Sequence, residues 1–381
     1  MTLPLDAGRL DDVAAITAGD PGEMLRAIAT SAAQVRSGAT AAAEAGVASL
    51  AATGRPRAVV IVGMGTAALA GDVLAALARS TCPVPVVVSR GFTVPGWVGA
   101  ADVVVALSSS GSTEETLVAT EEATRRGAHI VGIGPAGSPL ADRTERARGL
   151  LVPVSEVHSA RATFWALATP LLAVGGALGL VDLPGEVFEA TAERLYGLAL
   201  RCQPSTELFL NPAKELALSV AGTVPTVWGT SGLTTVAADR FASQWAQNGK
   251  APALSGSLPD VAQGVISTWD GPWVGDAQDL FADPLEGSAP TRLHPILLRD
   301  SSEHPRIAAQ AEAVRSLAQA RGAKLTELRA DGEYPYERLA SLIGLIDYAS
   351  GYLAVLTGVD PSPTPANEAV RLAAGAAAVA R

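Results

Sequence analysis

The sequence AVVIVGMGTAALAGD at residues 58–72 decides the fold class. It begins with a short, continuous apolar run rich in β-branched residues, which is typical of a strand buried on both faces of a sheet. A glycine turn and a helical stretch over residues 67–79 follow this run directly. The pattern predicts the first strand, turn and helix of a parallel α/β sheet.

The same alternation continues along the chain. In the first half, a helix is expected over residues 114–126, and strands are expected at residues 84–89, 102–107 and 129–134. In the second half, helices separate strands expected at residues 224–229, 295–299 and 324–328, whereas residues 251–290 are expected to be irregular. We therefore expect an α/β fold with two tandem, doubly wound parallel-sheet domains, at residues 1–183 and 184–381.

Composition excludes several classes of protein. Of the 381 residues, 48% are hydrophobic and 17% are charged, which excludes a disordered chain. There are 38 acidic and 28 basic residues, so the surface repels phosphate polymers and no nucleic-acid partner is expected. Cys82 and Cys202 stand far apart and belong to no Cys/His cluster. We therefore expect no metal, no cofactor and a reducing, cytoplasmic compartment.

One stretch is long enough to cross a membrane. Residues 162–181 form a run of twenty positions without a charged side chain. The run contains Pro170 and three glycines and lacks flanking Lys/Arg clusters, so a buried packing helix is favoured over a membrane span. The first twelve residues lack a charged and then apolar leader, so no signal peptide is expected.

The strongest chemical motif is SSSGSTEET at residues 108–116, which follows a predicted strand and opens a predicted helix. Free backbone N–H groups, the positive end of a helix dipole and short hydroxyl side chains together suit a phosphate monoester. The alternative is that Ser and Thr only cap the helix while Glu114 and Glu115 complement its dipole. One cap needs one hydroxyl and the loop has five, so phosphate binding by Ser110 and Thr113 is favoured.

The glycine turn at residues 63–72 and this serine loop together resemble the sugar isomerase (SIS) domain. The run LIGLIDYASGYLAVLTGVDPSPTP at residues 342–365 is similar to the closing segment of bifunctional phosphoglucose/phosphomannose isomerases, and residues 237–250 also match that family in position. The resemblance covers nearly the whole chain, from Val59 onward. It implies two SIS domains, a hexose phosphate as ligand, and a homodimer whose crevice is completed by the neighbouring subunit.

The resemblance also assigns residues to the ligand. The family has a glycine–serine pair where this chain has Thr66 and Ala67, so one phosphate-binding hydroxyl is lost and Thr66 can substitute for it. Arg161 falls at the family's active-site arginine, and Arg371 aligns loosely with a late lysine. The complete set implied to contact the ligand is Gly65, Thr66, Ser108, Ser110, Gly111, Thr113, Arg161, Gln247, Gln263 and Arg371.

The proton-transfer positions differ from those of the family. Interconversion of an aldose and a ketose needs a group that opens the ring and a carboxylate that carries a proton between C2 and C1. The family's carboxylate begins a Glu-Asn-x-Lys motif, which here reads QNGK from Gln247, and Gln263 stands at the ring-opening histidine. An amide cannot take that proton, and each positioned group contributes ~10²–10⁴-fold. Little isomerase activity is therefore expected.

Two functions are compatible with these residues. The first is a hexose-phosphate binding protein that is catalytically impaired or inactive, with no catalytic residue assigned. The second is an active isomerase that uses a relocated base such as Asp260. The four histidines are expected to be structural, and His158 is the spare candidate for an acid.

Overall fold

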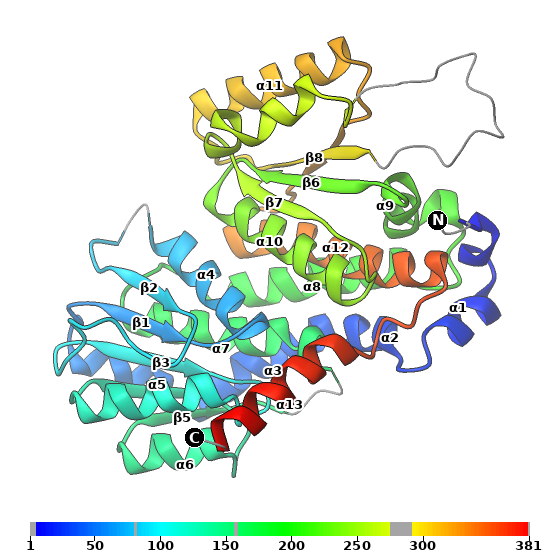
Figure 1. The fold of residues 1–381 in the computed structure, drawn as a ribbon. Helices are drawn as coiled ribbons and strands as arrows, with labels where there is room; N and C mark the ends of the chain where they lie inside the picture. Colours follow the sequence, from blue (N-terminus) through cyan, green and yellow to red (C-terminus); the bar gives the residue numbers. More distant parts are fainter. Residues whose placement is uncertain (1–4, 80–81, 156–158, 275–291, 380–381) are drawn as a thin grey trace, which may run out of the picture.

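The computed structural model describes residues 5–79, 82–155, 159–274 and 292–379, and it contains two parallel sheets (Figure 1). The first has the strand order β2-β1-β3-β4-β5 and the second the order β7-β6-β8-β9. In each sheet the chain starts at an inner strand, adds a neighbour on one side and then crosses to the other side. The expected α/β fold with two tandem, doubly wound parallel sheets is confirmed.

The strands lie close to their expected positions. Those of the first sheet are β1 (Val59–Val62), β2 (Val86–Ser89), β3 (Val103–Leu107), β4 (His129–Gly134) and β5 (Leu150–Pro153). Those of the second are β6 (Val224–Gly229), β7 (Leu254–Ser257), β8 (Leu293–Arg299) and β9 (Thr326–Arg329). The sequence did not predict β5, nor β7, which lies in the stretch expected to be irregular.

Strand β1 shows why its sequence is apolar throughout. Val59 and Ile61 belong to one hydrophobic cluster, whereas Val60 and Val62 belong to a second cluster on the opposite face. Successive side chains of a strand point to opposite faces, so a strand covered on both sides needs apolar residues at every position.

Helices cover both faces of the first sheet. They are α3 (Ser31–Glu44), α4 (Thr66–Ala78), α5 (Glu114–Arg125), α6 (Pro139–Arg146) and α7 (Phe164–Ala177), preceded by α1 (Val13–Gly19) and α2 (Met24–Ala29). Short 3₁₀ turns occur at Ala7–Leu10, Val47–Thr53 and Ala160–Ala162. Helix α7 occupies the long apolar run and is buried, as expected. Its Gly175 permits close packing on α4, because a Cβ there would lie 2.5 Å from Leu74 Cδ1.

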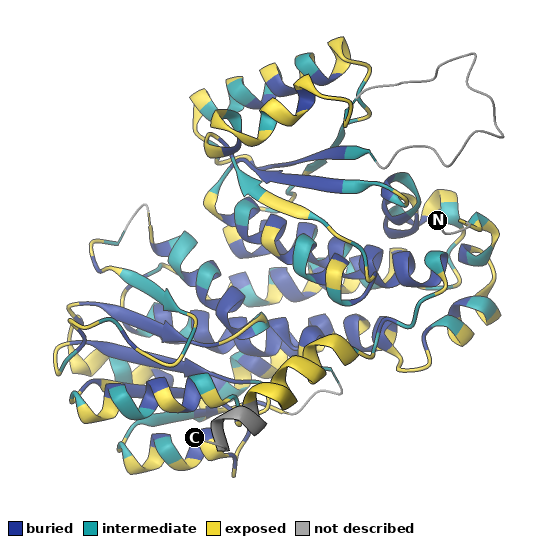
Figure 2. Ribbon diagram, in the orientation of Figure 1, coloured by how far each residue is buried: buried dark blue, intermediate teal, exposed yellow. Residues whose placement is uncertain are grey.

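The second half is built from longer helices. They are α8 (Glu186–Arg201), α9 (Pro212–Val220), α10 (Gly232–Gln247), α11 (Pro305–Ala320), α12 (Pro335–Thr357) and α13 (Pro365–Val379). The 3₁₀ turns are η4 (Leu208–Leu210), η5 (Asp260–Gln263) and η6 (Val265–Asp270). Figure 2 shows that α12 is buried, whereas the described side chains of α13 are exposed.

Helix α12 is the one described helix that is long and apolar enough to cross a membrane. Its most apolar window has a mean hydropathy of 1.6, but 89% of that window is buried inside the protein. Buried polar partners also lie along it. Asp347 accepts two hydrogen bonds from Arg240 of α10, at 2.8 and 2.9 Å, and both side chains are almost inaccessible. Helix α12 therefore has the contacts of a core helix.

The pair formed by Arg240 and Asp347 also joins the two halves of the chain. Arg240 Nη2 donates to the carbonyl oxygen of Arg161, at 2.6 Å, so α10 is tied to the segment before α7. Helix α12 also packs against α1 and α2. The boundary between residues 183 and 184 stays a prediction, since one hydrophobic cluster continues across both halves.

Candidate functional site at the domain crevice

The serine loop forms a compact chain of hydrogen-bonded hydroxyls directly after β3. Ser108 Oγ lies 2.9 Å from Thr113 Oγ1 and 3.4 Å from Ser110 Oγ. Ser110 Oγ in turn accepts hydrogen bonds from the backbone N–H and the hydroxyl of Ser112. Gly111 has a φ of 63°, and a Cβ there would lie 2.2 Å from Ser138 Oγ, so the loop requires glycine at this position.

These hydroxyls do not act as a simple helix cap. Thr113 is the N-cap of α5, but its side chain accepts no hydrogen bond from the helix backbone. By contrast, Ser138 caps the next helix by accepting a hydrogen bond from the Ala141 N–H at 3.3 Å. The first turn of α5 therefore presents N–H groups without a side-chain cap from Thr113, which is an arrangement suited to an anion. Phosphate contact by this loop stays a prediction.

The glycine turn lies at the same edge of the sheet. Strands β1 and β3 are parallel neighbours, with Val62 beside Ala106, so the turn after β1 and the serine loop after β3 lie at the same end. Because the chain crosses from one side of β1 to the other here, this is the topological switch point where open α/β sheets bind ligands. Gly65, with a φ of 54°, is the N-cap of α4, and Thr66 is its first residue.

A cavity of about 480 Å³ connects the glycine turn with the second domain. From the first domain it is lined by Gly65, Thr66 and Asp72, and from α10 by Asp239 and Ser243. Ser108, Ser110 and Thr113 are not among its lining residues. We name this space the Gly65 cavity.

Gln247 lies one helical turn beyond that cavity. Its Nε2 donates to Ser243 Oγ at 2.8 Å, and its carbonyl oxygen accepts a hydrogen bond from Arg161 Nη1 at 2.8 Å. Lys250 Nζ also donates to this carbonyl, and burial, together with repulsion from Arg161, lowers the pKa of Lys250. The structure thus brings Gln247, Arg161 and Lys250 together.

Arg161 is buried, and its guanidinium donates hydrogen bonds to other residues of the chain. Besides Gln247 O, its Nη1 donates to Asn248 Oδ1 at 3.1 Å and Pro361 O at 2.9 Å, and its Nη2 donates to Ser362 O. Burial, and then the positive charge of Arg240, lower the pKa of Arg161. Its guanidinium joins the end of α10 to the loop before α13, and its contact with a ligand stays a prediction.

The remaining predicted residues lie elsewhere. Gln263 is exposed at the end of η5, Asp260 is exposed at its start, and Arg371 is exposed on α13. None of these three residues lines the Gly65 cavity. Their contacts with a ligand stay predictions.

Two histidines have clear structural roles. His294 is buried, and its Nε2 lies 2.8 Å from Thr326 Oγ1. His304 is the N-cap of α11 and accepts a hydrogen bond from the Arg306 N–H at 3.1 Å. His158, the spare acid candidate, lies outside the described residues.

Sequence reasoning missed the two carboxylates of the crevice, Asp72 and Asp239. Burial and the negative charge of Asp239 raise the pKa of Asp72, although an ion pair with Arg90 opposes this. Asp239 Oδ1 accepts a hydrogen bond from Ser255 Oγ at 2.7 Å. The spacing of Asp239, Ser243 and Gln247 by four residues on one predicted helix was the signal that could have located this face.

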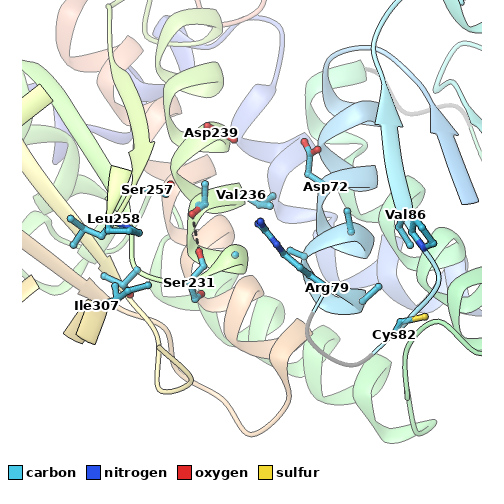
Figure 3. Close-up of a pocket in the computed structure, with 18 of the residues that line it drawn as sticks. Asp72, Arg79, Cys82, Val86, Ser231, Val236, Asp239, Ser257, Leu258 and Ile307 are labelled. Carbon is cyan, nitrogen blue, oxygen red and sulfur yellow. Dashed lines mark hydrogen bonds between the residues drawn. The ribbon is translucent and has the colours of Figure 1, made fainter. Parts of the chain in front are cut away.

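A larger cavity of about 900 Å³ continues from the Gly65 cavity (Figure 3). Asp72 and Asp239 line both. Ser231 and Ser257 of the second domain face α4 and Arg79 across this space. Within the described ranges, no group of three or more His, Cys, Asp or Glu side chains is placed to hold a metal ion.

Comparison with known proteins matches both halves of the chain. Residues 55–178 match the SIS domain, and residues 209–372 match the bacterial phospho-glucose isomerase C-terminal SIS domain. A bifunctional phosphoglucose/phosphomannose isomerase of Caldicellulosiruptor bescii is 30% identical over 80% of this chain and 86% of that protein. A protein of the same name from Aquifex aeolicus is 26% identical over 82% of this chain and 89% of that protein.

The fold is also similar to that of solved structures. The crystal structure of a glucose-6-phosphate isomerase from Chlamydia trachomatis superposes with a TM-score of 0.68, at 14% identity, over 93% of this chain and 78% of that chain. At that identity the likeness shows the fold alone. Together with the two tandem sheets and the sequence relatives, it gives a single conclusion: the chain belongs to the bifunctional phosphoglucose/phosphomannose isomerase family.

Proposed function

We propose that this protein binds a hexose phosphate at the crevice between its two domains, with the phosphate held by the serine loop. The observation that carries the proposal is the use of the Thr113 hydroxyl. It pairs with Ser108 instead of capping α5, so the loop keeps a chain of hydroxyls beside N–H groups at a helix N-terminus. Gly65 and Thr66 stand at the same sheet edge and line the Gly65 cavity, which would hold the sugar ring.

We infer further that isomerase activity is impaired relative to the family. The relatives are named isomerases, and an isomerase needs a group that accepts a proton from carbon. Gln247 keeps the length and hydrogen-bonding capacity of glutamate but cannot accept that proton. Its side chain donates a hydrogen bond to Ser243, so the amide has a partner within α10. A binding site can persist here after the chemistry has been lost.

The second candidate function is an isomerase with a relocated base. It is favoured by Asp72 and Asp239, which line the Gly65 cavity, rather than by Asp260, which is exposed on η5. Turnover of fructose 6-phosphate that is lost in Asp239→Asn but retained in Asp260→Asn would support it. If the protein binds the sugar but shows no turnover, only the first function, hexose-phosphate binding, remains.

We also propose that the protein works in the cytoplasm as a homodimer. The support is α13, whose described face exposes Val370 and Leu372 at 72% and 70%. Apolar side chains this exposed are expected to be covered by a second copy of the chain. A dimeric mass by light scattering at micromolar concentration is expected, and a monomeric mass would remove the proposal.

Calorimetric titration with fructose 6-phosphate, glucose 6-phosphate and mannose 6-phosphate tests the binding function. We expect Ser110→Ala and Thr113→Ala each to raise the dissociation constant about tenfold, because each removes a hydrogen bond to a charged phosphate. The matched control is Ser267→Ala, an exposed serine of η6. Unchanged affinity in both loop variants, or no binding of any of the three sugars, contradicts the proposed function.

A further inference from the structure

Arg240 is a buried arginine that borders the Gly65 cavity and has no part in the proposed function so far. It lies on α10, and its side chain is 1% exposed. It shares its wall of the cavity with Asp239 and Ser243, while Gly65 and Thr66 line the cavity from the first domain. Buried donors are nearly always hydrogen-bonded, so each N–H of this side chain should have a partner.

The protein holds one edge of the guanidinium firmly. Nε and Nη2 donate to the two carboxylate oxygens of Asp347, at 2.8 and 2.9 Å. Nη2 also donates to the carbonyl oxygen of Arg161 at 2.6 Å, and the guanidinium carbon lies 5.2 Å from the centre of the Phe164 ring. These contacts fix the orientation of the guanidinium before any ligand arrives.

The third nitrogen, Nη1, carries two N–H groups that have no partner. It makes no hydrogen bond with any residue that the structure describes. Nη1 is not one of the fully enclosed polar atoms that lack a partner, so it is open to a neighbouring space. Because the other two nitrogens face Asp347 and Arg161, Nη1 is the donor that faces the Gly65 cavity. A partner that enters from this cavity is therefore expected.

The charges around Nη1 favour an uncharged partner. Asp347 already balances the positive charge of Arg240 at hydrogen-bond distance. Asp72 and Asp239 line the same cavity and lie on facing helices (Figure 3). Arg90 pairs with Asp72, whereas Asp239 has no ion-pair partner in the described part of the chain. A free carboxylate repels a phosphate but accepts hydrogen bonds from hydroxyl groups, so this cavity suits the sugar and not its phosphate.

One hexose phosphate can reach both the serine loop and this cavity. The turn that carries Gly65 follows β1, and the serine loop follows the neighbouring parallel strand β3 at the same end of the sheet. Adjacent strands lie ~4.8 Å apart. The cavity of about 480 Å³ contains both Gly65 and Arg240 in its lining, and its volume is within the range of small-molecule sites, ~300–1,000 Å³.

We propose that Arg240 is a sugar-recognition residue, whose Nη1 donates hydrogen bonds to a hydroxyl or carbonyl oxygen of the bound hexose. The inference rests on the proposed function and extends it from the phosphate to the sugar. The serine loop binds the phosphate of any phosphate monoester, and Arg240 makes the site prefer a hexose phosphate to a shorter one. The alternative is that Arg240 only joins α10 to α12 and has no role in binding.

Calorimetric titration of Arg240→Lys with fructose 6-phosphate, glycerol 3-phosphate and inorganic phosphate tests this inference. Lysine keeps the positive charge beside Asp347 but lacks the second edge of the guanidinium. We expect the dissociation constant for fructose 6-phosphate to rise about tenfold, because a hydrogen bond from a charged group is lost. Those for the two smaller ligands should not change. Arg125→Lys, at an exposed arginine that ends α5, is the matched control.

A second variant gives the same test if Arg240→Lys does not fold. Arg240→Gln/Asp347→Asn removes both charges of the buried pair, so it leaves no uncompensated charge, and it also lacks Nη1. We expect the same selective loss of fructose 6-phosphate binding.

The outcomes separate the two proposals. Unchanged affinity for fructose 6-phosphate in a folded variant, or an equal loss for all three ligands, overturns the role of Arg240 and leaves hexose-phosphate binding standing. Equal affinity of the parent for fructose 6-phosphate and glycerol 3-phosphate overturns it as well, without any substitution. Failure of the parent to bind any hexose phosphate overturns the proposed function itself.

Discussion

The two sheets offer corresponding crevices that differ in the residue directly after the central strand. The central strands β3 and β8 occupy the same place in the two strand orders, and the residues that follow them are Ser108 and Asp300. In the first domain the loop that follows carries a chain of hydrogen-bonded hydroxyls. In the second domain the same position carries a buried carboxylate.

Asp300 receives the donors that an anionic ligand would otherwise use. Ser231 and Ser302 each donate a hydroxyl to Asp300 Oδ2 at 2.9 Å, and Arg338 Nε donates to Oδ1 at 2.9 Å. Burial by itself would raise the pKa of Asp300, but the hydrogen bond from Ser231 and the charge of Arg338 outweigh it, and the pKa is lowered. The second crevice therefore contains its own anion. One topology thus gives one crevice whose central loop carries hydroxyls and one whose central loop carries a buried, paired carboxylate. The side chains, and not the fold, distinguish the two crevices.

The largest expected effect follows from removing that internal anion. Asp300→Ser makes the second crevice resemble the first and leaves Arg338 buried without its carboxylate, since the Asp300 side chain is 1% exposed and that of Arg338 is 11% exposed. Removal of one partner of a buried pair costs about 3–5 kcal/mol. We expect the free energy of unfolding, measured by urea denaturation, to fall by that amount at pH 7.

The double variant Asp300→Ser/Arg338→Met separates the charge from the packing. It removes both charges and is expected to recover part of the lost stability. A loss below about 1 kcal/mol in Asp300→Ser would contradict the view that this carboxylate holds the second crevice together.

The same contrast explains what the sequence could predict. The serine loop is contiguous, so its hydroxyl density at the end of an apolar run was visible without a structure. The role of Asp300 was not visible, because its partners Ser231 and Arg338 come from distant segments. The placement of Asp72 and Asp239 on facing walls of the crevice was missed for the same reason.

Secondary structure was likewise predicted where the pattern lies within one continuous stretch of sequence. Strands β1 and β3 were predicted because both faces are buried and their sequences are continuously apolar. Strand β7 was missed because its sequence LSGS is partly exposed at the sheet edge and carries no apolar pattern. The position of Gln247 was predicted from its motif, but its bond to Ser243 depends on helical spacing that only the folded α10 makes visible.

A second prediction distinguishes the domains by pH. His294 of β8 is buried, and burial, helped by the charge of Lys324, lowers its pKa to about 4 from an ordinary value of 6.5. The unfolded chain then binds a proton more readily than the folded one, so stability is lost as the pH falls from 6.5 toward 4. The loss reaches about 3 kcal/mol at the low end.

His294→Gln removes this part of the pH dependence. We expect its free energy of unfolding to fall less than that of the parent between pH 7 and pH 4.5, by urea denaturation at both values. His129 of the first sheet is exposed, so His129→Gln serves as the control and keeps the parental slope. Equal slopes for the parent and His294→Gln would show that His294 is not buried in its neutral form.

The smallest expected effect comes from placing a carboxylate in the serine loop of the first crevice. Ser110→Asp places a carboxylate where Ser110 already accepts hydrogen bonds from the Ser112 N–H and hydroxyl. The new carboxylate would take those donors, as Asp300 takes those of Ser231 and Ser302, and it would repel an incoming phosphate. We expect the dissociation constant for fructose 6-phosphate, measured by calorimetric titration, to rise at least about 100-fold, which is about 2.7 kcal/mol.

Two controls show whether that loss of affinity comes from the serine loop. Ser110 is exposed, so the fold should tolerate the charge and Ser110→Asp should retain the parental melting temperature. Ser267→Asp adds the same charge at an exposed site on η6 and is expected to leave binding unchanged. If Ser110→Asp binds the sugar as the parent does, the phosphate lies outside the serine loop, and the difference between Ser108 and Asp300 has no bearing on which crevice takes the ligand.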